Sequence, residues 1–250
     1  MKRRGVPAAG SIAQALDIFR SEVRFYREIA PEVGVRVPAC YRAEISDDGT
    51  LLVLEDLSSW EAGADPAAAA RVLAKLHAGW SGRAHLRWPW LRPVGAAIDL
   101  VESLYADTWP AIAARRDLTP RVLDLSGRLV GKVTDSEHAI GRAGPLTLTH
   151  GDASLANMRT STAAEIALLD WEDVSAAPGI ADLGWLLVSS VAPARWDEVI
   201  AAYGATAGLT EVLPAAAVQG LLSLSDYPDG SSASAQWLTR LEAAAGYLSA

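Results

Sequence analysis

The chain has 250 residues, of which half are apolar and 21% are charged, as in an ordinary globular protein that buries a full core. Its net charge is −8, and from Ser154 onward three Lys and Arg stand against eleven Asp and Glu, which argues against a nucleic-acid partner and suits a bound cation. Cys40 is the only cysteine, which excludes an internal disulfide, and no stretch reaches the ~18 uncharged apolar residues of a membrane span, so we expect a cytoplasmic protein without membrane contact.

The first predicted element is a helix over residues 11–30, with Ser11 as its N-cap. Apolar residues then recur at helical spacing: Ile12, Leu16, Phe19, Val23 and Tyr26. Glu22 lies on or beside this apolar stripe, where a carboxylate needs a cationic partner. Two short strands are predicted next, over residues 41–45 and 51–54, joined by a turn that contains Gly49.

After a break over residues 57–65, the sequence is mainly helical. Asp65 and Pro66 predict the start of the next helix, as a cap followed by a first-turn proline. Further helices are predicted over residues 96–114, 121–139, 180–190, 194–203, 214–225 and 233–248, with a loop or broken helix over 83–93. Two short β-type runs interrupt this pattern, over residues 146–149 and 166–169, and we expect them to pair as a hairpin.

Three polar residues follow or end these two runs. Asp152 and Asn157 lie in the loop after the first run, and Asp170 ends the second. Pairing of the runs would bring the three side chains together. Phosphoryl transfer requires such a group, because it needs a base for the hydroxyl acceptor and oxygen ligands for Mg²⁺. A metal-dependent hydrolase with Asp152 and Asp170 around one ion is an alternative, disfavoured because His150 is the only imidazole nearby.

The order of motifs in this region resembles a known family. His150-Gly151-Asp152 precedes Asn157, and Leu169-Asp170-Trp171-Glu172, Gly179 and Asp182-Leu183 follow. This pattern is similar to that of the aminoglycoside phosphotransferase and choline kinase family, a small-molecule branch of the protein-kinase fold. Its upstream segments resemble the ecdysteroid-kinase-like branch most. The spacing from Asp152 to Asn157 equals that of the protein-kinase catalytic loop.

The resemblance implies a role for each of these residues. Asp152 would be the catalytic base, Asn157 a metal ligand and Asp170 the main metal ligand. His150 would support the loop structurally, and Asp182 would brace it by hydrogen bonds. ATP and Mg²⁺ would be the cofactors.

The resemblance extends to the nucleotide site. Residues 51–57 are similar to the family's hinge, in which main-chain groups near Glu55, Asp56 and Leu57 would hydrogen-bond adenine.

The fold also requires a strand lysine that pairs with a helix glutamate and holds the α- and β-phosphates. Glu22 suits the glutamate's role, and of the three lysines only Lys2 precedes the Glu22 helix at a workable distance. A disordered terminal charge is a nearly equal interpretation of Lys2. No glycine-rich phosphate loop occurs in the chain, so we expect either missing residues upstream of Met1 or a half-open nucleotide site.

Together these features predict an α+β, two-lobed protein-kinase-like fold. A truncated N-terminal lobe would span residues 1–57 and end in the hinge, and a mainly helical C-terminal lobe would span residues 58–250. The predicted function is ATP- and Mg²⁺-dependent transfer of the γ-phosphoryl group to a hydroxyl of a small molecule. This acceptor could be cationic and would lie among the C-terminal helices and the loop over residues 88–93. The alternative is a pseudokinase-like protein that binds a nucleotide or metabolite without turnover, because the glycine-rich strands are missing.

Overall fold

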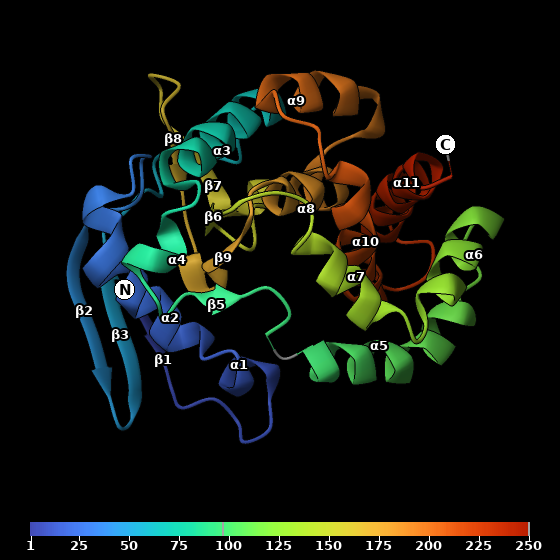
Figure 1. Ribbon diagram of the computed structural model, residues 1–250, viewed down its shortest axis with the longest axis horizontal. Coiled ribbons are helices and arrows are strands. Elements are labelled where there is room, and N and C mark those ends of the chain that lie inside the picture. The colour runs from blue at the N-terminus through green and yellow to red at the C-terminus, as the bar shows by residue number, and fades with distance from the viewer. Residues whose placement is uncertain (97, 250) are drawn as a thin grey trace.

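The computed structural model describes residues 1–96 and 98–249 (Figure 1). It combines small three-stranded sheets with many helices, so the predicted α+β class is confirmed. The first sheet lies at one end of the long axis and the helices α6 and α11 lie at the other (Figure 1). One hydrophobic cluster nevertheless runs from the first helices to the last. Within the described ranges, no helix combines the length and the apolarity needed to cross a membrane.

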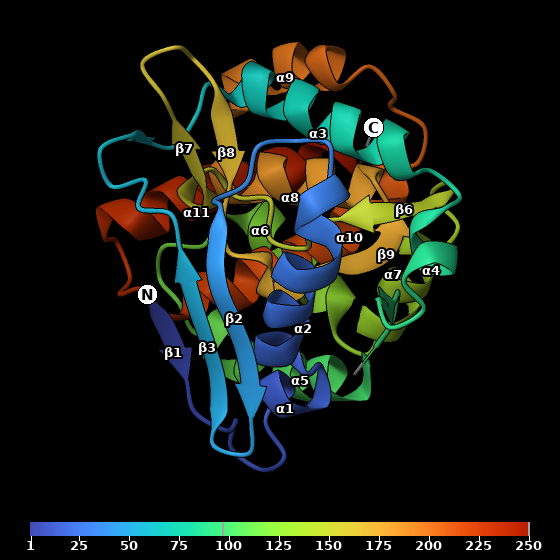
Figure 2. The same cartoon turned by 90° about the vertical axis from the view of Figure 1, so that its left-hand side faces the viewer.

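The first sheet has the order β1-β3-β2 and is antiparallel. Its strands are β1 (Lys2–Arg4), β2 (Cys40–Ser46) and β3 (Gly49–Leu54). The strands predicted over residues 41–45 and 51–54 are confirmed as β2 and β3, whereas β1 was not predicted. Lys2 pairs with Leu52, and the alternation of side chains along a strand places Lys2 and Arg4 on the same face. Helix α2 lies against this sheet (Figure 2).

The predicted helix over residues 11–30 is in fact broken. Ser11 caps α1 (Ile12–Ala15), and Asp17 then adopts a left-handed conformation with φ 49° before α2 (Ile18–Arg24) begins. Aspartate tolerates this conformation because its short polar side chain fits there. A π-helical turn and a 3-10 turn continue the segment, over Phe25–Ile29 and Ala30–Glu32. A single-residue break of this kind leaves the hydrophobic periodicity almost intact, so the expectation of one continuous helix was wrong.

The middle of the chain begins with α3 (Pro66–Trp80), which starts as predicted. The Asp65 side chain accepts a hydrogen bond from the Ala68 amide and caps the helix. The loop predicted over residues 83–93 contains the short helix α4 (Ala84–Arg87) and the two-residue strand β5 (Arg92–Pro93).

The remaining helices mostly follow the predicted pattern. They are α5 (Ile98–Ala113), α6 (Pro120–Leu129), α7 (Val133–Ile140), α8 (Ile180–Ser190), α9 (Trp196–Tyr203), α10 (Leu209–Ser225) and α11 (Ser232–Tyr247), with a 3-10 turn at Pro193–Arg195. The segment expected as one helix over residues 121–139 is split at Gly131, which has a φ of 69°. Helix α10 begins at Leu209 and includes Pro214, because its packing against α7, α8 and α11 outweighs the local preference.

The prediction that residues 146–149 and 166–169 pair with each other as a hairpin was wrong. Both strands exist, as β6 (Leu146–Thr149) and β8 (Ile166–Leu168), but they lie in different sheets. Strand β6 pairs antiparallel with β9 (Ser175–Pro178), which pairs parallel with β5 on its other side. Strand β8 pairs with β7 (Met158–Thr160), which pairs with β4 (Glu61–Ala62). The unpredicted partners are short, and β9 consists of small residues and proline, so neither has a clear strand pattern.

Candidate active site

The loop over residues 150–157, named the catalytic loop after its expected role, leaves the end of β6. His150 is fully buried, and Gly151 follows it with a φ of 85°. A Cβ atom at Gly151 would overlap the carbonyl oxygen of Asp173, so both the conformation and the space require glycine. The turn at Gly151 then presents the half-buried Asp152.

Both carboxylate oxygens of Asp152 are held by neutral donors. The indole nitrogen of Trp185 donates to Oδ1 at 2.6 Å, and the amide nitrogen of Asn157 donates to Oδ2 at 2.7 Å. The same Asn157 nitrogen donates to the Asp152 carbonyl at 3.1 Å. No cation contacts Asp152 among the described residues, so the carboxylate is oriented without being neutralised. Among those residues the Asn157 amide oxygen accepts no hydrogen bond, which leaves it available as a ligand.

Asp182 braces the catalytic loop from below. It is 2% exposed and accepts hydrogen bonds from the amides of His150 at 2.7 Å and Gly151 at 3.0 Å. Nε2 of His77 lies 3.0 Å from its carboxylate, and Nδ1 of His77 lies 2.8 Å from the Tyr203 hydroxyl. Burial alone would raise the pKa of Asp182, but the hydrogen bond and charge of His77 and the neighbouring His150 outweigh it and lower that pKa. His77 is itself buried.

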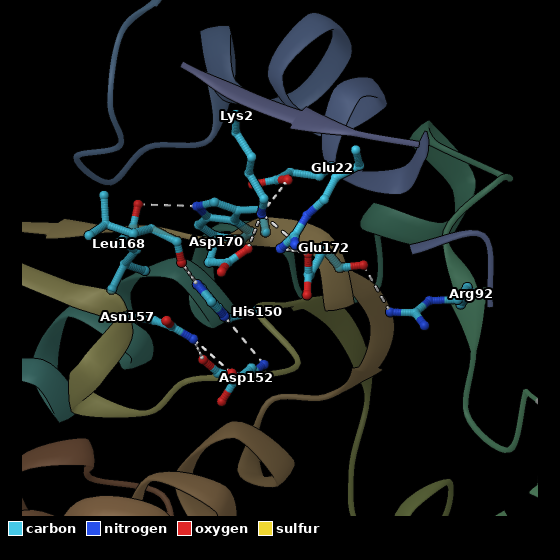
Figure 3. Close-up of polar contacts among 12 residues, drawn as sticks. Lys2, Glu22, Arg92, His150, Asp152, Asn157, Leu168, Asp170 and Glu172 are labelled. Atoms are coloured by element: carbon cyan, nitrogen blue, oxygen red, sulfur yellow. Dashed lines mark hydrogen bonds and ion pairs between the residues drawn. The ribbon is translucent and has the colours of Figure 1, made fainter. Parts of the chain in front are cut away.

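The His150 ring joins the catalytic loop to the end of β8 (Figure 3). Its Nδ1 accepts from the Asp152 amide at 3.3 Å, so Nε2 carries the proton and donates to the Leu169 carbonyl at 2.7 Å. The centroid of the His150 ring also lies 4.5 Å from that of Trp171. Trp171 in turn stacks on Phe25 of the π-helical turn, with the ring centroids 4.0 Å apart. The hairpin of β7 and β8 also joins the catalytic loop to the end of β8, since the Leu169 amide donates to the Asn157 carbonyl at 2.9 Å; the hairpin at the site is thus β7–β8 and not the expected β6–β8.

The Lys2 cluster, formed by Lys2, Glu22, Asp170 and Glu172, lies on the other side of His150 (Figure 3). Nζ of Lys2 lies 2.7 Å from Glu22, 2.6 Å from Asp170 and 3.2 Å from Glu172. Asp170 has a left-handed φ of 59° where β8 ends. Three carboxylates, from Glu22, Asp170 and Glu172, offer oxygens within 4.8 Å of one another. Such an oxygen donor set fits Mg²⁺.

The charges of the Lys2 cluster are unbalanced. Burial raises the pKa of Glu22 to about 7, and the charges of Asp170 and Glu172 add to this effect against the opposing influence of Lys2. Burial lowers the pKa of Lys2, but the Glu22 charge and the hydrogen bond with Asp170 outweigh it, so the net shift is upward. Arg4 adds only a contact of 3.5 Å to Glu172. The cluster therefore has a shortage of positive charge that a divalent cation would relieve.

The predicted hinge follows β3. The Glu55 carboxylate accepts from Arg36 at 2.6 Å and from the Ala39 amide at 2.9 Å, and Asp56 accepts from the Ser58 amide at 2.8 Å. Their side chains are thus used within the protein. In the described part of the chain, the Glu55 carbonyl and the Leu57 amide have no hydrogen-bond partner, which leaves one acceptor and one donor on the backbone.

A hollow with about 870 Å³ of open space lies beside the catalytic loop. Its lining includes Gly151, which precedes Asp152, and Trp185, whose indole nitrogen donates to Asp152. The other lining residues come from α1, the segment 92–96, α7, β6, β9, α8 and α10. Arg92 and Pro93 are therefore part of it, as expected for the predicted acceptor region. Trp88 is instead buried against Trp80.

Sequence reasoning missed two residues of this site. Glu172 follows Asp170 by two positions, and only the pairing of β1 with β3 shows that Lys2 reaches both. Trp185 follows Asp182 by three positions on α8, so helical spacing places both near the catalytic loop. That spacing was a usable signal for Trp185.

The sequence model of the phosphotransferase enzyme family matches residues 10–218. No curated protein sequence gives a significant match. Several solved structures share the fold. An aminoglycoside phosphotransferase from Alicyclobacillus acidocaldarius is 15% identical, with a TM-score of 0.57 over 99% of this chain and 84% of that one.

Two other solved structures extend this comparison. An aminoglycoside phosphotransferase from Streptomyces rimosus, in complex with ADP and streptomycin, is 18% identical, with a TM-score of 0.58 over 88% of this chain and 86% of that one. A choline kinase from Streptococcus pneumoniae is 13% identical, with a TM-score of 0.55 over 99% and 94%. The predicted protein-kinase-like fold is thereby confirmed.

Proposed function

We propose that this chain, which belongs to the phosphotransferase enzyme family, is a small-molecule kinase that transfers the γ-phosphoryl group of ATP to a hydroxyl and uses Mg²⁺. The observation that carries the proposal is the Asp152 carboxylate. Neutral donors hold both of its oxygens, and its neighbours Gly151 and Trp185 line a hollow that would admit an acceptor. The solved relatives with ADP and streptomycin, and the choline kinase, support this assignment.

The nucleotide would bind between two lobes that meet at the hinge near Leu57. The Glu55 carbonyl and the Leu57 amide would hydrogen-bond adenine, and Lys2, oriented by Glu22, would hold the α- and β-phosphates. Asp170 and Asn157 would hold Mg²⁺ through their oxygens. Mg²⁺ neutralises charge on the β- and γ-phosphates when it is bound.

Asp152 would act as the base. Its carboxylate would orient the acceptor hydroxyl and take its proton as the hydroxyl oxygen bonds to the γ-phosphorus. The bond from that phosphorus to the β–γ bridging oxygen breaks, and ADP leaves with the electron pair. The Trp185 and Asn157 bonds fix the carboxylate before the acceptor arrives, so little reorganisation is needed during the reaction.

The test is ADP release from Mg-ATP with and without a panel of hydroxyl compounds that includes streptomycin, choline and neutral sugars. We expect Asp152→Asn to lower turnover by about 10²–10⁴-fold, the usual contribution of a positioned base, while calorimetry shows intact Mg-ATP binding. Asp170→Asn should weaken Mg-ATP binding itself.

The opposite order of effects in the two variants would overturn the assigned roles. Mg-ATP binding without transfer to any compound would instead support the alternative function, a protein that binds a nucleotide without turnover. Failure to bind Mg-ATP at all would exclude the kinase and would leave, of the alternative, only the binding of a metabolite without turnover.

A further inference from the structure

Arg4 is a cation beside the Lys2 cluster that has no role in the proposed function. It lies two residues after Lys2 on β1, so the alternation of side chains along a strand places both on the same face of the sheet. Lys2 reaches from β1 to Asp170 and Glu172 (Figure 3). Nη2 of Arg4 lies 3.5 Å from Oε2 of Glu172, the same oxygen that Lys2 contacts. The two cations are therefore close neighbours.

The protein holds the Arg4 side chain in place but leaves part of it free to bind. Its guanidinium carbon lies 5.2 Å from the centroid of the Phe19 ring on α2, within the range of a cation–π contact. At 3.5 Å, the contact with Glu172 is longer than the ~2.7–2.9 Å of a strong charge-assisted hydrogen bond. Among the described residues Nη1 has no hydrogen-bond partner, and this atom is open to solvent. The side chain, which is 42% exposed, can therefore still donate to an anion.

The neighbours of Arg4 indicate which anion it would meet. Glu172 lies two residues after Asp170, the proposed main ligand of Mg²⁺, and Lys2 contacts both carboxylates. Bound Mg²⁺ bridges oxygens of the β- and γ-phosphates, so Arg4 lies on the side of the site where these two phosphates would bind. Lys2 is assigned to the α- and β-phosphates, which leaves the γ-phosphate for Arg4. The free oxygens of a terminal phosphate suit the forked donors of a guanidinium.

We propose that Arg4 is a further phosphate-binding residue, which contacts the γ-phosphate of ATP and gives the site a preference for ATP over ADP. This inference rests on the proposed function, because it assumes that a nucleotide binds with its phosphates at Lys2. Transfer of the γ-phosphoryl group to the acceptor would remove the contact. The product ADP would therefore be held less tightly than ATP.

The experiment compares two nucleotides that differ in the γ-phosphate. Calorimetry measures the binding of Mg-ADP and of the Mg²⁺ complex of a non-hydrolysable ATP analogue, in which an NH group replaces the β–γ bridging oxygen. The proteins are wild type, Arg4→Gln, Arg4→Lys and the control Arg3→Gln. Arg3 precedes Arg4 on β1 but is exposed on the other face of the sheet, so the control removes the same charge outside the site.

We expect Arg4→Gln to bind the ATP analogue about 10-fold more weakly than wild type, the lower end of the range for loss of a hydrogen bond to a charged group. Its affinity for ADP should change by no more than about twofold, because a charge that is not in contact is screened by solvent and salt. Unchanged ADP binding would also show that the variant is folded. Arg4→Lys retains the charge without the fork and should lose less, and Arg3→Gln should behave as wild type.

An equal loss of affinity for both nucleotides in Arg4→Gln would overturn the proposal, because Arg4 would then only balance the charge of Glu172. Equal binding of the ATP analogue by this variant and by wild type would overturn it as well.

The outcomes also separate the role of Arg4 from the kinase function. Transfer from ATP with an unchanged KM for ATP in Arg4→Gln would leave the kinase standing and remove the role of Arg4. A preference for the analogue that depends on Arg4, without transfer to any acceptor, would support the role of Arg4 and reject turnover. A wild type that binds neither nucleotide would reject both.

Discussion

Two buried carboxylates on opposite sides of His150, Glu22 and Asp182, have opposite pKa shifts although each is 2% exposed. The pKa of Asp182 is lowered because His77 and two backbone amides donate to it or lie close to it. The pKa of Glu22 is raised to about 7 because burial and two further carboxylates outweigh Lys2. Burial alone therefore does not determine the shift; the number of donors around each carboxylate does.

The two carboxylates belong to different halves of the site. The catalytic loop, with Asp182, has its hydrogen bonds supplied by the protein and is called the finished half; the Lys2 cluster, with Glu22, lacks positive charge and is called the unfinished half. At the catalytic loop, the protein supplies the hydrogen bonds that the polar groups need: Asp182 accepts from the loop backbone, and Asn157 and Trp185 donate to Asp152. The Lys2 cluster has three carboxylates against one close ammonium group. A carboxylate held by hydrogen bonds, beside a cluster that lacks positive charge, is the arrangement expected under the proposed phosphoryl transfer. Four predictions test this difference, in order of decreasing effect.

Trp171 packs between the catalytic loop and the segment that carries Glu22 of the Lys2 cluster, so its replacement should have the largest effect on stability. It is fully buried, between Phe25 and His150. Trp171→Ala should lower the free energy of unfolding by about 3–5 kcal/mol, as for other buried tryptophans, measured by urea denaturation. Trp171→Phe retains an aromatic ring against both neighbours and should lose clearly less. A loss below about 1 kcal/mol in the alanine variant, as at a surface position, would mean that the two halves are not joined here.

Asp182→Asn should lower the free energy of unfolding by about 1.5–3 kcal/mol at pH 7, because charge-assisted hydrogen bonds are lost. The folded-state pKa of Asp182 lies below its unfolded value. Its charge therefore contributes stability that is full above about pH 4 and is lost as the pH falls through the folded-state pKa. The difference between wild type and variant should shrink in acid. A difference that is constant from pH 7 to pH 3 would show that shape, and not charge, holds the loop.

Mg²⁺ should stabilise the protein through Asp170 of the Lys2 cluster and Asn157 of the catalytic loop, the two residues proposed to hold it. At a free concentration ten times its Kd, we expect about 1.4 kcal/mol of added stability, read as a rise in Tm. Asp170→Asn should remove this rise, and Asp152→Asn should retain it. Ca²⁺ at the same concentration is a useful control for simple screening of charge. An equal rise in the two variants would place the ion outside the Lys2 cluster.

Glu22→Gln should have the smallest effect. The glutamine removes one of three crowded negative charges while its amide oxygen can still face Lys2. We expect the free energy of unfolding to change by at most about 1 kcal/mol. The variant loses the ion pair with Lys2 but also loses the repulsion from the two other carboxylates, and these effects largely cancel. A penalty as large as that of Asp182→Asn would contradict the distinction between the two carboxylates.

The catalytic loop was predictable because its information is local. The five-residue spacing from Asp152 to Asn157 and the apolar run of α8 are visible in the sequence, and α8 has the predicted bounds. Asp152 and Asn157 are in direct contact because they belong to one tight turn.

The Lys2 cluster was less predictable because its contacts join distant parts of the chain. Lys2 was proposed only by elimination among three lysines, and its contacts depend on a three-residue strand that has no strand pattern of its own. The hairpin expected between β6 and β8 failed for a related reason. Strand pairing is decided by which partners are near after folding, and β7 (Met-Arg-Thr) and β9 (Ser-Ala-Ala-Pro) lack the apolar β-type run that marks β6 and β8.

The pairing of β1 with β3 sets more than the position of one lysine. Lys2 faces the cluster because it lies opposite Leu52, whereas Arg3, opposite Leu51, is exposed. A slip of one residue along β3 would exchange the two faces and present Arg3 in place of Lys2. The planar, forked guanidinium would then meet carboxylates now arranged around a compact ammonium group. The register of one strand pair thus decides whether an ammonium or a guanidinium group would meet the α- and β-phosphates of the proposed nucleotide.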